Sequence, residues 1–252
     1  YVSQTGAWGQ IGLAALSTVL ISASANAWND YLDIEIDRVN QPTRPLPAGL
    51  ITPNQAMLFS LILSALAILF AILINRVALT IVVVSIVLLY LYSWRLKSTV
   101  LIGNVVVATI SGLSAYFGGI AAGNPQPAIW LSIIIFIGIL GREILKTLAD
   151  YEGDLEYHCR TIATVWGRRP AKWLSSLILG LMLVAMFMPF FAQVYRPVYA
   201  LIVAVGVLPV VLYIIIMQLT KENSGPQYES LSQLMKYDFL IWFVAVWFGL
   251  PA

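Results

Sequence analysis

Four carboxylates lie within eight residues near the start of the chain, at Asp30, Asp33, Glu35 and Asp37. Only 10% of the 252 residues are charged, so this concentration needs a chemical explanation. If the preceding apolar helix continues through them, Asn29, Asp33 and Asp37 are spaced i, i+4, i+8 and line one stripe. Stacked carboxylates repel each other, and Mg²⁺ relieves this because it takes oxygen ligands and shares carboxylates with substrate phosphates. We refer to Asn29, Asp30, Asp33 and Asp37 as the first acidic cluster.

A second pair of aspartates at helical spacing follows more than a hundred residues later. Asp150 and Asp154 are again four residues apart, whereas Glu152 points elsewhere. We refer to Asp150 and Asp154 as the second acidic cluster. Two Mg²⁺ ions held by such clusters would take a diphosphate between them, and a diphosphate also attracts basic side chains. Four basic residues are at hand for this role: Arg44, Lys97, Lys146 and Arg160.

Charges at the end of a membrane helix are usually only its solvated cap. We assign that role to five charged residues near the clusters: Glu35, Arg38, Glu156, Arg168 and Arg169. For the four paired aspartates we favour a functional role, because the same spacing recurs on the same predicted side together with convergent cations. Lone Cys159 predicts neither a disulfide nor a metal site, and His158 is read as a solvated loop residue.

Aromatic residues allow two interpretations. Tyr92 and Tyr116 could supply π faces to a substrate carbocation in a site that excludes water. Tyrosines are equally ordinary at the interface between a membrane and water. Both alternatives stay open for these two residues.

The elements that must position these side chains are membrane helices. Hydrophobic residues make up 60% of the chain, and its mean hydropathy is +0.86. Long continuous apolar runs predict an all-α polytopic transmembrane helix bundle and are unlike the alternating segments of a β-barrel. We expect about eight spans, at roughly 7–28, 54–75, 77–93, 99–121, 127–148, 172–195, 198–219 and 235–251.

The basic residues predict which connections face the cytoplasm. Twelve of the 14 Lys and Arg residues lie in or beside alternate connections, and only Arg76 and Arg196 fall on the other side. This split follows the positive-inside rule. It places the connections at 29–53, 94–98, 149–171 and 220–234 on the cytoplasmic side. All twelve acids are expected on or next to that same side.

Several motifs resemble those of the UbiA-type intramembrane prenyltransferases. The string NDYLDIEID is similar to that family's N-D-x-x-D-x-x-x-D, and RPLPAG to its R-P-[IL]-P-x-G. YSWRLKS resembles its Y-S-x-x-L-K element, and KTLADYEGD followed by RTIATVWG resembles its second aspartate motif. The elements occur in the family's order over essentially the whole chain. Thr147 stands where many members have Asp, and Ala163 replaces the usual Pro.

The resemblance implies a bundle of nine helices around a central cavity and Mg²⁺-dependent transfer of a polyprenyl group from its diphosphate to an acceptor. It therefore predicts one UbiA-type domain over residues 1–252 that lacks its first helix. It implies that the first acidic cluster holds one Mg²⁺ and that the second holds another. Arg44, Lys97 and Arg160 would hold the diphosphate. Membrane lipid is the expected surrounding, and no nucleic acid is expected as a partner.

Among the branches of that family, the motifs look most like the archaeal type, which transfers geranylgeranyl from its diphosphate to geranylgeranylglyceryl phosphate. The quinone, tocopherol, chlorophyll and haem O branches share these motifs, so an aromatic acceptor stays open. A secondary transporter is the alternative from another class, but its acids should lie near mid-membrane. The D-G-x-x-A-R element of CDP-alcohol phosphotransferases does not occur. A scaffold built on an inactive enzyme is disfavoured by the intact aspartate pairs.

Overall fold

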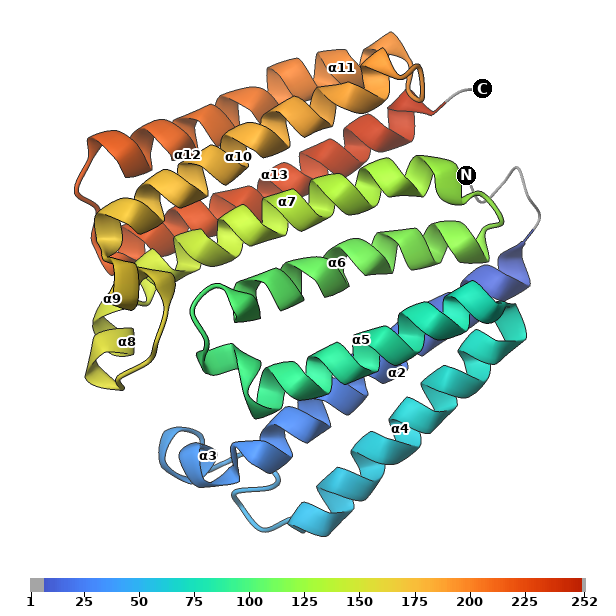
Figure 1. Ribbon diagram of the computed structural model, residues 1–252, viewed down its shortest axis with the longest axis vertical. Coiled ribbons are helices and arrows are strands. Elements are labelled where there is room, and N and C mark those ends of the chain that lie inside the picture. The colour runs from blue at the N-terminus through green and yellow to red at the C-terminus, as the bar shows by residue number, and fades with distance from the viewer. Residues whose placement is uncertain (1–6, 251–252) are drawn as a thin grey trace. The chain divides into compact units, whose positions relative to one another are not determined.

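The computed structural model describes residues 7–250, with the side chains of residues 39 and 40 excepted, and every long element in this range is a helix (Figure 1). The chain divides into two compact units. The first unit reaches residue 97 and also includes 113–128. The second comprises 98–112 and the chain from residue 129 onward. The single domain expected from the sequence stays a prediction.

The first unit is built from long helices that begin at local capping signals. Its elements are α2 (Trp8–Leu32), α3 (Ile34–Asn40), α4 (Pro53–Ile74), α5 (Arg76–Trp94), the 3₁₀ turn η1 (Leu96–Ser98), which ends across the boundary, and the second half of α6 (Ile102–Ala121). Thr52 caps α4 in a capping box with Gln55, and Pro53 occupies the first turn. Asn75 caps α5 by accepting a hydrogen bond from the backbone N–H of Ala78.

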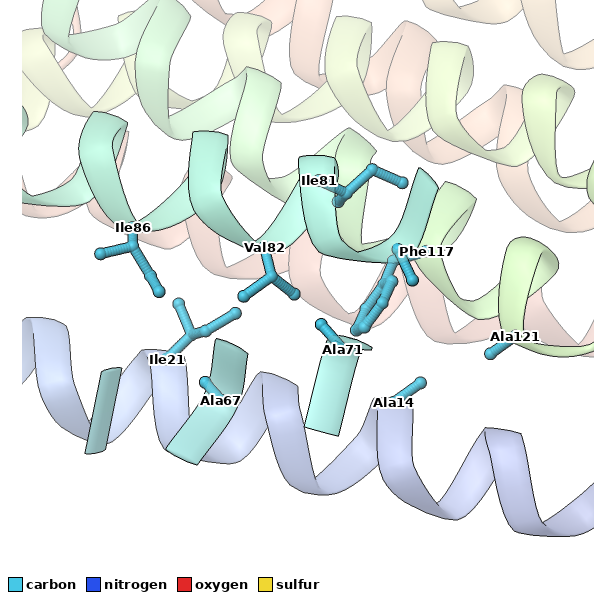
Figure 2. Close-up of a cluster of buried hydrophobic side chains, with 10 residues drawn as sticks. Ala14, Ile21, Ala67, Ala71, Ile81, Val82, Ile86, Phe117 and Ala121 are labelled. Carbon is cyan, nitrogen blue, oxygen red and sulfur yellow. The ribbon is translucent and has the colours of Figure 1, made fainter. Parts of the chain in front are cut away.

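Small side chains let the helices of the first unit approach closely. Ala67, Ala71 and Ala78 are 0% exposed, and they pack with larger residues such as Ile21 and Phe117 in one cluster (Figure 2). Between membrane helices, close packing of small residues replaces the hydrophobic driving force that water would supply. The core of this unit therefore holds α2, α4 and α5 together and fixes the ends of α2 and α5, where the candidate residues lie.

The second unit contains the remaining helices. They are the first half of α6, α7 (Pro125–Ala149) from residue 129 on, α8 (Tyr151–Glu156), α9 (Ile162–Trp166), α10 (Arg168–Phe191), α11 (Pro197–Ile202), the π-helical turn η2 (Val203–Val207), α12 (Leu208–Thr220) and α13 (Gly225–Gly249). The hydroxyl of Tyr199 donates to the carbonyl of Met186 and accepts from Trp242 Nε1. These bonds link α10, α11 and α13. They also satisfy the Tyr199 hydroxyl and the Trp242 N–H, which would find no water to bond inside a membrane.

Within the described residues, eight helical stretches are long and apolar enough to cross a membrane, which confirms the predicted number. The last predicted span is wrong at its start, because α13 begins at Gly225 and not near 235. A capping box between Ser224 and Gln227 starts this helix, and Pro226 lies in its first turn. As a consequence Asp238, 3% exposed, lies in the middle of a membrane helix. The expectation that every acid lies on or next to one membrane face stays a prediction.

Candidate active site

The first acidic cluster lies where α2 ends and α3 begins. Asn29 and Asp30 belong to the last turns of α2, Asp33 separates the two helices, and Asp37 lies in α3. Asp33 has φ −96° and ψ 9°, a sparsely populated region in which many active-site residues are found. The i→i−4 pattern nevertheless continues, because Asp33 N donates to Asn29 O and Asp37 N donates to Asp33 O. The predicted stripe thus survives a local break in the helix.

Each carboxylate of the first cluster is paired with a basic side chain. Arg44 Nη1 lies 2.8 Å from Asp37 Oδ2 and 3.2 Å from Asp30 Oδ1. Lys97 Nζ donates to both carboxylate oxygens of Asp33, at 2.7 Å for Oδ2. Arg44 and Lys97 were both predicted as diphosphate ligands, and the structure brings both to this cluster. Two cations thus face three carboxylates, so the chain itself offsets all but one negative charge of the cluster.

Packing around Tyr90 holds this end of α2 against α5, a feature that sequence reasoning missed. The ring of Trp28 stacks on that of Tyr90 with centroids 4.8 Å apart and an interplanar angle of 8°. The Tyr90 hydroxyl lies within hydrogen-bond distance of the Ser24, Ser60 and Ser64 hydroxyls, at 2.9, 2.6 and 3.0 Å. A tyrosine inside an apolar run gives no sequence signal for this role, because any of its positions could face lipid.

A cavity of about 670 Å³ opens beside the first cluster, inside the first unit. It lies between α2 and α4 under the connection that joins them, and Asp30 and Asn26 belong to its wall. Most of the remaining lining is apolar, including Leu46, Ile51 and Phe59. A carboxylate at the rim of an apolar cavity suits an amphiphilic ligand with a polar head.

The second acidic cluster repeats the same backbone arrangement between α7 and α8. Asp150 separates the helices with φ −87° and ψ 1°, and Asp154 lies in α8. Asp150 N donates to Lys146 O and Asp154 N donates to Asp150 O, at 2.9 and 2.8 Å. Lys146, predicted to bind diphosphate, thus stands in the second cluster where Asn29 stands in the first.

Burial without a direct ionic partner raises the pKa of both aspartates of the second cluster. For Asp150 the main cause is desolvation, which Lys146 opposes and Glu229 reinforces. Desolvation also dominates the raised pKa of Asp154, where Thr161 opposes it by a hydrogen bond and Asp150 adds to it. Among the ion pairs of the described chain, none involves Asp150 or Asp154. A cation bound near Asp150 and Asp154 would therefore stabilise their ionised forms more than it would stabilise the already paired aspartates of the first cluster.

The N-terminal turns of α13 complete the surroundings of Asp150. A Cβ atom on Gly225 would lie 2.7 Å from the carbonyl oxygen of Ala149, so only glycine fits where α13 meets the end of α7. Glu229, one turn further along, is the like charge felt by Asp150. Neither residue was singled out from the sequence. The Ser-Gly-Pro-Gln string, a capping signal that was available, would have placed both on a helix.

The other predicted residues are placed less closely. Arg160 is exposed in the connection between α8 and α9, and Tyr92 lies near the end of α5. Tyr116 packs against the hydrophobic cluster that contains Phe117 and Ala78, the latter at the beginning of α5, so the structure does not bring it to Asp33. Thr147 is buried and its hydroxyl donates to its own helix at the carbonyl of Ile144.

The donors available fit a magnesium ion that keeps part of its water shell. Both clusters offer hard oxygen ligands, and within residues 7–250 no three His, Cys, Asp or Glu side chains form a complete metal cage. Mg²⁺ does not need such a cage, since it is typically held by one or two carboxylates, waters and substrate phosphates. The residues present therefore suit an ion that arrives with a phosphate-bearing substrate.

Comparison with known sequences gives a consistent result. A model described as the UbiA prenyltransferase family matches residues 2–249. The digeranylgeranylglyceryl phosphate synthase of Sulfolobus acidocaldarius is 36% identical over 232 residues, which is 92% of this chain and 83% of that relative. The synthase of the same name from Methanopyrus kandleri is 44% identical over 155 residues, or 62% of this chain. That match spans 57% of the relative's length.

Solved structures resemble this chain as well. A structure of digeranylgeranylglyceryl phosphate synthase is 30% identical and superposes with a TM-score of 0.85 over 92% of this chain and 82% of its own. A UbiA homologue from Archaeoglobus fulgidus bound to GPP and Mg²⁺ has a TM-score of 0.72 at 19% identity over 93% of this chain and 88% of its own. The second likeness speaks for the fold alone.

Proposed function

Since this chain belongs to the UbiA prenyltransferase family, we propose that it transfers a geranylgeranyl group from geranylgeranyl diphosphate to the hydroxyl of geranylgeranylglyceryl phosphate. One observation carries the choice of substrates: the Sulfolobus acidocaldarius relative, 36% identical over 92% of this chain, is named for the product of that reaction. The apolar cavity beside Asp30 is consistent with an isoprenoid ligand.

The proposed chemistry is an alkyl transfer that forms an ether. The bond between the first carbon of the geranylgeranyl group and the diphosphate oxygen breaks, and the acceptor oxygen bonds to that carbon. The hydroxyl proton and the diphosphate are released. Mg²⁺, when bound, would neutralise the diphosphate and so make it a better leaving group. An apolar surrounding strengthens each charge contact and keeps water from the carbocation-like carbon.

In this proposal the acids hold the metal and the bases hold the phosphates. Asn29, Asp30, Asp33 and Asp37 would bind one ion, and Asp150 and Asp154 a second. Arg44 and Lys97 pair with the aspartates of the first cluster. We propose that they change partner when the diphosphate and its metal arrive. The metal then occupies the carboxylate oxygens, and the phosphate oxygens become the acceptors for both basic side chains. That both clusters act on the same diphosphate is inferred from the resemblance to the family.

Lys146 and Arg160 would contact the diphosphate from the side of the second cluster. Tyr92 is kept as a candidate contact to the substrate near the end of α5. Tyr116 is retained only as a wall of the apolar region, given its packing. The distribution of basic residues supports a cytoplasmic location for both clusters.

The decisive experiment offers purified protein labelled geranylgeranyl diphosphate, Mg²⁺ and a panel of acceptors. We expect label in geranylgeranylglyceryl phosphate and none in hydroxylated aromatic acids. Label in an aromatic acid alone would assign the chain to the aromatic branch of the family. Turnover at the wild-type rate by Asp33→Ala without Mg²⁺ would rule out the mechanism. Counterflow of a labelled solute in liposomes would instead support the alternative of a secondary transporter.

A further inference from the structure

A basic pocket lies in the second unit, and none of its lining residues belongs to the second acidic cluster. Its volume is about 330 Å³, and it is formed where α10 begins and α12 ends. Its lining residues are Arg168, Arg169, Lys172, Trp173, Leu219 and Glu222. Three basic residues face one acid there, so the pocket carries an excess of positive charge. A surface charge that only set the topology would not need to line a concave site.

The basic side chains of this pocket are partly built into the protein. Lys172 is only 7% exposed, and its Nζ lies 2.9 Å from Glu222 Oε1. Arg168 Nη2 donates to the carbonyl of Asn223 at 2.7 Å. The Nε atom of Arg168 is buried and has no hydrogen-bond partner in the described part of the chain. The guanidinium group of Arg168 also lies over the rings of Tyr151 and Tyr228, 5.3 and 5.9 Å from their centroids, so its position is fixed by the protein.

The only acid of the pocket is easily displaced. The Glu222 side chain is 87% exposed, so water competes for it and its pairing with Lys172 is weak. The hydrogen bond from Lys172 lowers the pKa of Glu222, which keeps this carboxylate ionised. An incoming anion could therefore replace Glu222 at Lys172 while Glu222 returns to solvent.

The backbone adds to the attraction for an anion. Gly167 is the N-cap of α10, with φ 94°, and no side chain caps the first turn. The N–H groups and the positive end of the helix dipole at the start of this 24-residue helix therefore face the region of Arg168 and Arg169. Phosphates are common ligands of such helix starts when basic side chains are also present.

Apolar side chains continue from the pocket along both helices. Trp173 is 58% exposed, and Leu177 and Leu181 follow it on α10 with 61% and 52% exposed. On α12, the exposed Ile216 precedes the lining residue Leu219. A charged pocket that opens onto an apolar surface fits an amphiphile better than a free ion. Tryptophan at this level is typical of the boundary between headgroups and acyl chains.

We propose that this pocket binds the phosphate of an anionic membrane lipid, with the lipid's acyl chains along α10 and α12. Arg169 and Lys172 contact the phosphate, and Arg168 adds positive charge to the wall of the pocket. None of the lining residues belongs to an acidic cluster, although Arg168 contacts the ring of Tyr151 beside Asp150, so lipid binding is measured without the transfer substrates. Binding can thus succeed or fail independently of the substrate assignment.

The test measures lipid binding to the full chain in detergent. Thermal shift and native mass spectrometry would compare short-chain phosphatidylglycerol with phosphatidylcholine of the same chain length and with inorganic phosphate. We expect phosphatidylglycerol to bind at least about fivefold more tightly than either. Equal binding of phosphatidylcholine would overturn the proposal, and equal binding of inorganic phosphate would show a site for a soluble anion.

Charge variants locate the binding. Arg169→Gln should weaken phosphatidylglycerol about fivefold, the effect of one basic residue at a membrane surface. Lys221→Gln is the matched control, because Lys221 is exposed and adjacent to Glu222 but does not line the pocket. An equal loss in this control would indicate nonspecific attraction and overturn the proposal.

A variant that binds phosphatidylglycerol more tightly distinguishes an effect on the pocket from damage to the fold. Glu222→Gln removes the competing acid, so it should tighten phosphatidylglycerol binding about fivefold. A misfolded protein would not bind more tightly, and unchanged or weaker binding by Glu222→Gln contradicts the proposed exchange at Lys172. Displacement of bound phosphatidylglycerol by geranylgeranylglyceryl phosphate would assign the pocket to the acceptor and would also overturn the proposal.

Discussion

Helix α2 breaks at Asp33 and helix α7 breaks at Asp150, with nearly the same dihedral angles at both aspartates. In each case a backbone N–H on the far side of the break still donates to the aspartate's own carbonyl four residues earlier. The side chains at i, i+4 and i+8 therefore remain on one stripe while the helix changes course. The two clusters share one way of presenting carboxylates at the end of a membrane helix.

The clusters differ in how their charge is balanced. Arg44 and Lys97 form direct ion pairs with the three carboxylates of the first cluster and offset two of their three charges. In the second, Lys146 acts on Asp150 from a distance, and burial with Glu229 raises the pKa of that carboxyl. An incoming metal must displace basic side chains in the first cluster, whereas it relieves an existing electrostatic cost in the second. Metal affinity and stability should therefore respond differently to the same substitution in the two clusters.

Neutralising one aspartate in each cluster should have the largest effect. Asp33→Asn and Asp150→Asn keep the side-chain size, and each should lower turnover roughly a thousandfold, since several kcal/mol of charge stabilisation is lost. The transfer of labelled geranylgeranyl to glyceryl phosphate measures this. Glu35→Gln is the matched control, because Glu35 is exposed and pairs only with Arg38, and its turnover should stay within about twofold of wild type.

The same two variants should change metal-free stability in opposite directions. Asp150→Asn removes a desolvated charge and should raise the midpoint of thermal unfolding in EDTA. Asp33→Asn leaves Lys97 without its partner and should lower it. Shifts of the same sign in both variants would show that the two clusters are balanced alike.

The response of thermal stability to Mg²⁺ without substrate should also differ between the two clusters. Removal of divalent metal by EDTA should abolish turnover. Adding Mg²⁺ back without diphosphate should raise the unfolding midpoint chiefly through the second cluster, which has no basic side chain to displace. Asp154→Asn should remove most of this shift and Asp37→Asn little of it. The reverse ranking would mean that the ion pairs of the first cluster do not compete with metal.

Spacing was enough to predict that the aspartates of each cluster share one stripe, because the i, i+4 relation is local and survives the breaks at Asp33 and Asp150. The family and the class of enzyme, predicted from the motifs, are confirmed by the sequence match. The membrane helix bundle, predicted from the apolar runs, is confirmed by the eight candidate spans and the similar structures. Pairing between distant residues could not be predicted. Lys97 and Asp33 are 64 residues apart, and only the packing of α5 on α2 brings them together.

The surroundings of the clusters were predictable only in part. Nearly every position of the spans is apolar, so periodicity cannot tell which face of α5 carries Tyr90 toward the serines of α2 and α4. The start of α13 was missed for another reason. Glu229, Lys236 and Asp238 lower its hydropathy, although Ser224 and Gln227 give a local capping signal. Of these three residues only Asp238 is buried, and the local capping signal outweighed the hydropathy signal there.

Removing the basic partner of the first cluster should make that cluster behave like the second. Lys97→Met should raise the KM for the diphosphate by about ten- to a hundredfold, through loss of a phosphate contact. It should also enlarge the Mg²⁺-dependent thermal shift, because Asp33 is released. Arg76→Met, at the opposite end of α5, serves as the control and should change neither quantity. A smaller Mg²⁺ shift in Lys97→Met would contradict competition at Asp33.

Acid pH should give the smallest contrast, through the raised pKa values of Asp150 and Asp154. A carboxyl whose pKa is raised on folding binds more protons in the folded state, so its contribution to stability is present below the ordinary value of 3.8 and is lost as pH rises through the raised pKa. In EDTA, the unfolding midpoint of wild type should therefore include a component that falls as pH increases across that window. In Asp150→Asn this component should shrink, because the titrating group is gone. Thermal unfolding at a series of pH values measures how steeply the midpoint falls with pH. If this slope were unchanged in Asp150→Asn and changed in Asp33→Asn, the uncompensated charge would lie in the first cluster instead.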